Sequence, residues 1–217
     1  MIRIRNLRKA YYLNGQTNVV ADNISIDFES GKVIGLLGGN GAGKSSLLRM
    51  VAGVMAKDSG TIDISGTVSW PIGFSGSFHP DLTGAQNTKF LARIYGVDTD
   101  ELRAYVEEFA ELGQRFYLPI RTYSSGMRSR LAFGVSMGIK FDTYLVDEVT
   151  SVGDARFRKK SMRVFTDRMQ SSGALLVTHN LNVIQRVCDQ ACILHKGKIM
   201  HFKDVGEAVE KHREMSA

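Results

Sequence analysis

The chain has 217 residues, 43% of them hydrophobic and 23% charged, a composition that excludes a disordered chain and suits one α/β domain with a modest insert. Its net charge of +6 is compatible with an anionic ligand, a nucleic acid or an acidic membrane surface, and does not choose among them. No apolar run reaches the roughly 18 residues of a transmembrane helix, and the N-terminus lacks the apolar core of a signal peptide, so we expect a cytosolic protein.

The first two predicted strands alternate apolar and polar side chains. Residues 2–7 and 24–28 have this half-buried pattern, and Asn14-Gly15 between them is a strong turn signal. We therefore expect a small antiparallel sheet ahead of the first buried strand. Tyr11 and Tyr12 end the first strand, where an aromatic ring either stacks on a nucleotide base or packs in the core.

A glycine-rich stretch lies between the buried strand predicted at 33–37 and a helix predicted over 45–55, and it fits the phosphate-binding pattern G-x-x-x-x-G-K-[ST]. Its glycines let backbone N–H groups point inward around an anion, and the helix start adds free N–H donors. Lys44 supplies a cation for the terminal phosphates, and the Ser45 hydroxyl can ligate Mg²⁺. The expected phosphate-binding residues are Gly38, Gly39, Asn40, Gly41, Ala42, Gly43, Lys44, Ser45 and Ser46.

The next part of the chain departs from the alternation of strands and helices. Short strands at 61–64 and 68–70 lead into 71–84, whose glycines and prolines indicate irregular structure. Its aromatic residues mark either a contact surface or side chains folded back onto the domain.

Helices predicted over 84–95 and 98–112 follow, the second with a capping box of Asp98 and Glu101. These helices interrupt the α/β pattern, so they indicate an insert. We expect a single domain over 1–217, made of an α/β core at 1–74 and 139–217 and a helical subdomain at about 75–138.

Within this insert, Ser124-Ser125-Gly126-Met127 precedes a helix of small and apolar residues. Such a sequence at a helix N-terminus is a second candidate anion site. A helix N-cap alone would also explain it. No sequence argument places it beside the phosphate-binding loop of the same chain.

A second chemical site follows two apolar strands. Asp147 and Glu148 end the strand at 144–146, and His179 comes shortly after the strand at 175–177. Parallel strands deliver their last residues to one edge of a sheet, where the phosphate-binding loop also lies. Asp147 would hold Mg²⁺, Glu148 would orient or deprotonate an attacking water, and His179 would contact a γ-phosphate or hold a water.

The α/β pattern then runs to the end of the chain. Further strands are predicted at 191–194 and 199–202, and helices at 154–170, 180–188 and 204–215. The helix at 154–170 carries a basic cluster, either a solvated face or a surface for lipid or a partner: Arg156, Arg158, Lys159, Lys160 and Arg163.

Together these residues resemble the nucleotide-binding subunit of ABC transporters over nearly the whole chain. GGNGAGKSS is similar to the Walker A motif, YLVDE to Walker B, and YSSGM stands where the family signature belongs. Asp154 lies in the position of the D-loop, and His179 matches the switch histidine. The resemblance implies a P-loop NTPase (RecA-like) core with a small antiparallel β subdomain and a mainly helical insert that carries the signature.

The resemblance also implies a mechanism. Two copies close head to tail, and each ATP lies between one P-loop and the other copy's signature, formed here by Ser124, Ser125, Gly126 and Met127. Glu148 would be the catalytic carboxylate with His179 beside it, and Ser45 and Asp147 would hold Mg²⁺. Tyr11 resembles the family's base-stacking aromatic, and Tyr12 stays an alternative because the segment before the P-loop is longer than is common.

Departures from the family pattern narrow the resemblance. The glutamine that usually follows the strand at 68–70 is missing, and SWPIGFSGSFHPDLTG is similar to exporters of capsular polysaccharide in Gram-negative bacteria. This implies an ATPase at the cytoplasmic face of the inner membrane, powering export of a lipid-linked glycan through a separate permease. Phe74, Phe78 and Leu82 are expected to be exposed for that permease. The alternatives are O-antigen or teichoic acid export, and a soluble ABC-type ATPase on nucleic acid, although no nucleic acid is expected.

Overall fold

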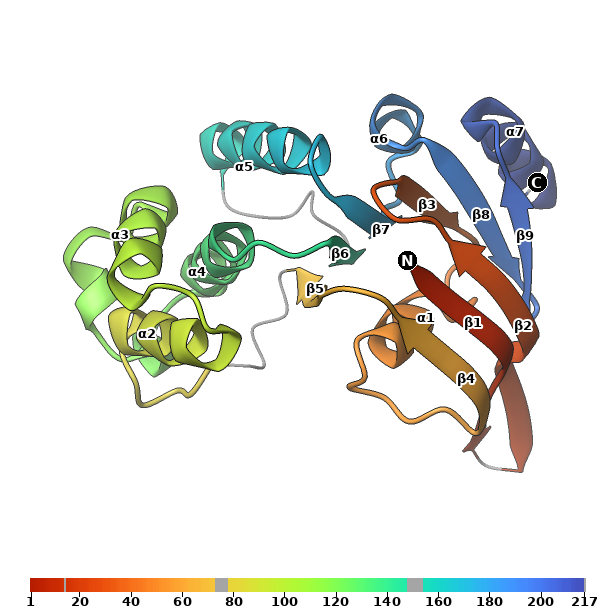
Figure 1. Cartoon of the computed structure of the whole chain (residues 1–217), viewed down its shortest axis with the longest axis horizontal. Coiled ribbons are helices and arrows are strands. Elements are labelled where there is room, and N and C mark those ends of the chain that lie inside the picture. Colours follow the sequence, from red (N-terminus) through yellow and green to blue (C-terminus); the bar gives the residue numbers. More distant parts are fainter. Residues whose placement is uncertain (14, 73–77, 148–153, 217) are drawn as a thin grey trace. The chain divides into compact units, whose positions relative to one another are not determined.

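The structure is a computed structural model that describes residues 1–13, 15–72, 78–147 and 154–216. The chain forms two compact units (Figure 1). The first unit comprises residues 1–71, 141–148 and 169–217, and the second comprises residues 72–140 and 149–168. Residues 154–168 therefore group with the helical residues, whereas the sequence had suggested that they belong to the α/β core.

A three-stranded antiparallel sheet begins the first unit, as the alternating pattern predicts. Its order is β2–β1–β4, with β1 at Ile2–Leu13, β2 at Gln16–Phe28 and β4 at Ser59–Ile64. The first two strands are longer than predicted, because register shifts between Ile4 and Ala10 let them stay paired up to Leu13 and Gln16.

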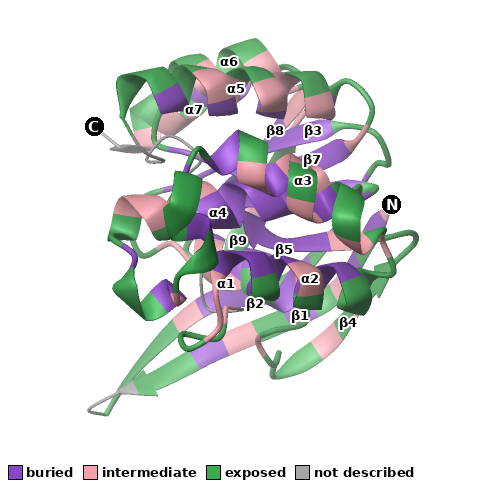
Figure 2. Ribbon diagram, turned by 90° about the vertical axis from the view of Figure 1, so that its left-hand side faces the viewer, coloured by how far each residue is buried: buried purple, intermediate pink, exposed green. Residues whose placement is uncertain are grey.

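A six-stranded sheet forms the rest of the α/β framework. Its strand order is β5 (Val68–Ile72), β6 (Thr143–Asp147), β7 (Gly173–Val177), β3 (Val33–Leu37), β8 (Gln190–His195) and β9 (Lys198–Phe202). Strands β6, β7, β3 and β8 are parallel, and β9 closes an antiparallel hairpin with β8. Every residue of β3 and β7 is buried (Figure 2), which explains their unbroken apolar sequences.

Three helices accompany these sheets in the first unit: α1 (Lys44–Val51), α6 (Leu181–Val187) and α7 (Val205–Ser216). Leu47 and Leu48 of α1 join a buried cluster that contains residues of both sheets. Helix α6 packs against β3 at Gly35, where an added Cβ would lie 2.9 Å from the Cδ1 atom of Ile184. Helix α1 ends before the predicted residue 55, since Gly53 takes a φ of 72° and turns the chain away.

Four helices, α2 (Gly84–Tyr95), α3 (Thr99–Ala110), α4 (Ser125–Gly138) and α5 (Ala155–Met169), make up most of the second unit, with short 3₁₀ turns at Gly113–Tyr117 and Ile120–Thr122. Phe109 of α3 stands at their junction, because its ring centre lies 5.6 Å from that of Phe133 in α4 and 5.3 Å from that of Phe157 in α5. These aromatic contacts explain why α5 groups with the insert.

The helix starts agree only partly with the capping prediction. The Asp98 carboxylate accepts the N–H groups of Asp100 and Glu101 at the start of α3. Helix α2 begins with both hydrogen bonds of a capping box: the Thr83 side chain accepts the Gln86 N–H, and the Gln86 side chain accepts the Thr83 N–H. No helix among the described residues combines the length and apolar character needed to cross a membrane.

Candidate functional site

The glycine-rich loop between β3 and α1 has a backbone that only glycine adopts readily. Gly38, Gly41 and Gly43 have φ values of 150°, 75° and 101°. At Gly43 an added Cβ would lie 2.7 Å from the Cβ of Val20, so the loop also lies close to β2. The loop is thus held between β2 and the start of α1, where backbone N–H groups are available to an anion.

Lys44, the first residue of α1, is 8% exposed, and its ammonium group is held inside the loop. The Nζ atom donates to the carbonyl oxygens of Gly38 at 2.8 Å and Gly39 at 2.9 Å. A buried cation beside the N–H groups of a helix N-terminus creates a positive potential that suits phosphate.

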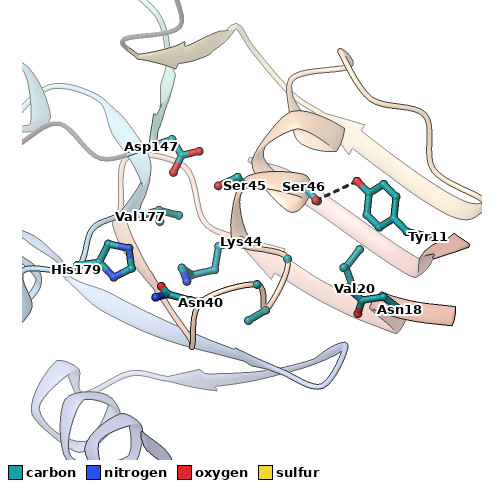
Figure 3. Close-up of a pocket in the computed structure, with 13 residues that line it drawn as sticks. Tyr11, Asn18, Val20, Asn40, Lys44, Ser45, Ser46, Asp147, Val177 and His179 are labelled. Carbon is teal, nitrogen blue, oxygen red and sulfur yellow. Dashed lines mark hydrogen bonds between the residues drawn. The ribbon is translucent and has the colours of Figure 1, made fainter. Parts of the chain in front are cut away.

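A cavity of about 360 Å³ opens over this loop, entirely within the first unit. Figure 3 shows Asp147, Val177 and His179 on one side of Lys44, and Tyr11 on the opposite side. Its lining residues are Tyr11, Asn18, Val20, Asn40, Gly41, Ala42, Gly43, Lys44, Ser45, Ser46, Asp147, Val177 and His179. Asn18 and Val20 had not been singled out in the sequence, because β2 reaches the loop only through the long β1–β2 hairpin.

The topology of the sheet brings Asp147 and His179 to this cavity. Asp147 ends β6 and pairs with Val177 at the end of the neighbouring parallel strand β7, and His179 follows two residues later. Carboxylate, imidazole and ammonium groups thus surround one space, as expected at the carboxyl edge of a parallel sheet. Glu148, the expected catalytic carboxylate, lies outside the described residues.

Helix α7 adds an ionisable group that the sequence had not indicated. Burial lowers the pKa of His212, and the nearby charges of Lys44 and His179 lower it further. His212 does not line the cavity, but the charge of Lys44 reaches it.

The two N-terminal tyrosines have different environments. Tyr11 lines the cavity, and its hydroxyl lies 3.1 Å from the hydroxyl of Ser46 (Figure 3) and 3.1 Å from the sulfur of Met55. Tyr12 is 78% exposed and is not among the lining residues of the cavity. The structure therefore favours Tyr11 as the aromatic wall of the cavity.

The second candidate anion site lies in the other unit, at the start of α4. The Ser124 hydroxyl accepts the N–H of Met127 at 3.2 Å, so this serine is the helix N-cap. Ser124, Ser125, Gly126 and Met127 line a cavity of about 520 Å³. Asp154 lines it as well, from just before α5.

Arg130 also lines this second cavity, and sequence reasoning had missed it. Its Nη2 atom lies 2.8 Å from the Asp154 carboxylate, and its guanidinium stands 4.5 Å from the ring centre of Phe157. The Phe157 N–H holds the pKa of Asp154 below its ordinary value, helped by the charge of Arg130. The sequence signal for Arg130 was its position about one helical turn after Met127, which places both residues on the same face of α4.

The expected docking residues are less exposed than the sequence suggested. Phe74 lies outside the described residues, whereas Phe78 and Leu82 are half-buried, so the expectation that these two are exposed was wrong. The reason is that the Leu82 carbonyl accepts the Ile120 N–H at 3.0 Å and Arg121 pairs with Asp81 at 2.9 Å, which folds this segment onto the unit. The large exposed apolar residues of α2 are instead Phe90, Ile94 and Tyr95.

The chain matches a family model and is similar to named proteins over nearly its full length. Residues 21–151 match the family model described as ABC transporter. The chain is 46% identical to the polysialic acid transport ATP-binding protein KpsT of Escherichia coli, over 98% of this chain and 96% of that protein. It is 41% identical to the capsule polysaccharide export ATP-binding protein CtrD of Neisseria meningitidis, over 99% of this chain and 100% of that protein.

More distant matches, at 32% to 37% identity, include proteins named for O-antigen export and teichoic acids export. Among solved structures, the ATP-binding cassette MJ0796, a dimer in a post-hydrolysis state with ADP and Pi, has a TM-score of 0.79. It is 18% identical, and the likeness covers 94% of this chain and 99% of that one. This likeness confirms the fold class expected from the sequence.

Proposed function

The chain belongs to the ABC transporter family, and from this premise we propose that it hydrolyses ATP to power export of a lipid-linked capsular polysaccharide across the bacterial inner membrane. The observation that carries the proposal is the cavity in which the P-loop, Asp147 and His179 meet. Relatives named for polysialic acid transport and for capsule polysaccharide export match at more than 40% identity over nearly the full length, which supports the choice of cargo.

The P-loop residues bind the phosphates of ATP. Backbone N–H groups of the loop and of the start of α1 donate hydrogen bonds to the phosphate oxygens, while Lys44 neutralises their charge from within the loop. The Tyr11 ring stacks on the base, since it lines the cavity on the side of Lys44 opposite to Asp147.

Ser45 and Asp147 are suited to Mg²⁺, because both line the same cavity and offer the hard oxygen donors that this ion prefers. Mg²⁺ bound there supplies charge neutralisation to the terminal phosphates. Glu148 orients or deprotonates the attacking water, and His179 bonds the γ-phosphate or that water.

The signature residues act on a second copy of the chain. Ser124, Ser125, Gly126 and Met127 line a cavity at a helix N-terminus, the kind of site that binds a phosphate oxygen. In the proposed homodimer this site closes over the nucleotide held by the partner's P-loop. Asp154, in the D-loop position, lines the same cavity.

An integral membrane permease is the proposed third component, docked near Phe74, Phe78 and Leu82. A cavity of about 300 Å³ supports this location, because Phe78, Pro80 and Ile120 give it an apolar wall and Arg128 gives it positive charge. The same cavity includes Ser125 and Ser129 of α4, so a docked segment would touch the helix that carries the signature. The protein would then lie at the cytoplasmic face of the membrane.

Removing the P-loop ammonium group tests the ATPase. Lys44→Ala is expected to lower ATP turnover by at least about a hundredfold, since the phosphates lose their principal cation. Lys57→Ala is the matched control, because Lys57 is an exposed lysine beyond α1 and does not line the cavity. Turnover that is unchanged in Lys44→Ala contradicts the proposal.

The cargo is tested by isolating the complete exporter. Co-purification of the permease with this chain, followed by identification of the bound glycan and of the glycolipid that stimulates turnover, is expected to yield capsular polysaccharide. Stimulation by an O-antigen or teichoic acid carrier would instead support those alternatives. ATPase activity that is stimulated by DNA or RNA in a salt-sensitive manner would indicate a nucleic-acid enzyme.

A further inference from the structure

The hydroxyl of Tyr11 contacts Ser46 and Met55, whereas its backbone lies in a part of β1 that is paired with one strand only. The ladder between β1 and β4 ends at the pair Arg8 and Ser59. Beyond Arg8, β1 is paired with β2 alone, and the β1–β2 register shifts on both sides of Lys9. A strand edge without a partner and with irregular pairing needs another contact to fix its direction.

Asp58, the residue before β4, supplies that contact. Its backbone N–H donates to the Arg8 carbonyl at 2.9 Å, and one carboxylate oxygen accepts the Ala10 N–H at 2.7 Å. The other carboxylate oxygen accepts a hydrogen bond from Lys9 Nζ at 2.9 Å. One residue thus holds three consecutive positions of β1, those that lead directly into Tyr11.

The lysine in this group also touches the ring. Lys9 Nζ stands 5.6 Å from the centre of the Tyr11 ring, within the range of a cation–π contact, and the Lys9 side chain is only 16% exposed. The Lys9 ammonium and the Ala10 N–H hold the pKa of Asp58 below its ordinary value, so the carboxylate is charged at neutral pH. The contacts therefore run from Asp58 through Lys9 to the aromatic wall of the cavity.

We infer that Asp58 is a positioning residue for the nucleotide base: it fixes Lys9 and Ala10, and through them it sets the direction of the Tyr11 ring on which adenine stacks. The inference rests on the proposed ATP site. It assigns Asp58 no contact with the phosphates, so its effect should depend on the base.

Two ligands separate a base effect from a phosphate effect. ATP carries the base, whereas inorganic tripolyphosphate offers only the phosphate chain to the P-loop. In the full chain, Asp58→Ala should weaken ATP binding by about tenfold, a part of what one stacked base contributes. Tripolyphosphate binding should change by less than about twofold, because Lys44 and the loop are untouched. Asp63→Ala, which removes an exposed carboxylate from β4, is the matched control and should alter neither affinity.

A double-mutant cycle tests whether Asp58 acts through the ring. If it does, Asp58→Ala should have no further effect on ATP affinity once Tyr11 is alanine. Additive losses, equal losses for ATP and tripolyphosphate, or an Asp58→Ala protein that binds ATP as Asp63→Ala does would each overturn the inference. Those results leave ATP turnover by the unmodified protein intact, whereas absence of turnover in the unmodified protein would contradict the proposed function itself.

Discussion

At the scale of single residues, the P-loop depends on backbone conformations that are unfavourable for residues other than glycine. The loop must bring its N–H groups and the Lys44 ammonium to one point, and two of its own carbonyls hold that ammonium. Gly43 combines two constraints, since its φ of 101° lies in the left-handed region and Val20 leaves no room for a Cβ. Substitution of Gly43 therefore tests how much these two constraints affect the free energy of unfolding.

Gly43→Ala should lower the free energy of unfolding by at least about 2 kcal/mol, because left-handed strain is joined by a clash with Val20 of β2. Gly53→Ala is the control, since Gly53 has a φ of 72° and open space around it. It should lower the free energy of unfolding by only about 1 kcal/mol, from strain alone. Denaturant unfolding measures both, and equal losses would show that the close approach to Val20 has no energetic effect.

At the scale of elements, a polar contact joins the beginnings of β5 and β6. The Asp142 carboxylate accepts the Thr67 N–H at 2.7 Å and the Thr67 hydroxyl at 2.9 Å, and the Asp142 N–H donates back to that hydroxyl at 3.0 Å. The Thr67 N–H, followed by the hydroxyl, holds the pKa of Asp142 below its ordinary value. This contact fixes the start of the strand that carries Asp147 to the cavity.

The lowered pKa makes the contact sensitive to acid. Its stabilisation is fully present above the unfolded carboxyl pKa of about 3.9 and is lost as the pH falls through the lower folded value. Asp142→Asn should therefore flatten the decline of the unfolding free energy below about pH 4. Denaturant unfolding across a pH series measures this, with Asp63→Asn as a control that keeps the contact. An unchanged acid profile in Asp142→Asn would show that this carboxylate does not contribute.

At the scale of the whole molecule, local signals in the sequence were enough to predict the order of the helices and strands. The buried strands are unbroken apolar runs, and the P-loop has a pattern of its own. Lys44, Ser45, Asp147 and His179 were expected at one sheet edge, and the structure places them around one cavity. These residues could be expected together because neighbouring parallel strands end at the same edge of a sheet.

Features that depend on residues far apart in the chain could not be predicted in this way. The grouping of α5 with the insert follows from Phe157 meeting Phe109, and neither residue signals the other. The partial burial of Leu82 follows from the backbone bonds that Leu82 and Pro80 make to the 3₁₀ turn at Ile120–Thr122. The ion pair of Arg130 and Asp154 likewise could not be predicted, because the two residues are far apart in the sequence.

The molar mass of a hydrolysis-deficient variant tests most directly whether one copy's P-loop and the other copy's signature enclose the nucleotide. Glu148→Gln should bind Mg–ATP without turnover, and light scattering should then show a rise from the 24.0 kDa of one chain to twice that mass. Adding Gly126→Arg should leave ATP bound and return the mass to that of one chain, because the arginine blocks the signature site. Glu148→Gln that stays a single chain when saturated with Mg–ATP, or that hydrolyses ATP at the unmodified rate, would contradict the account.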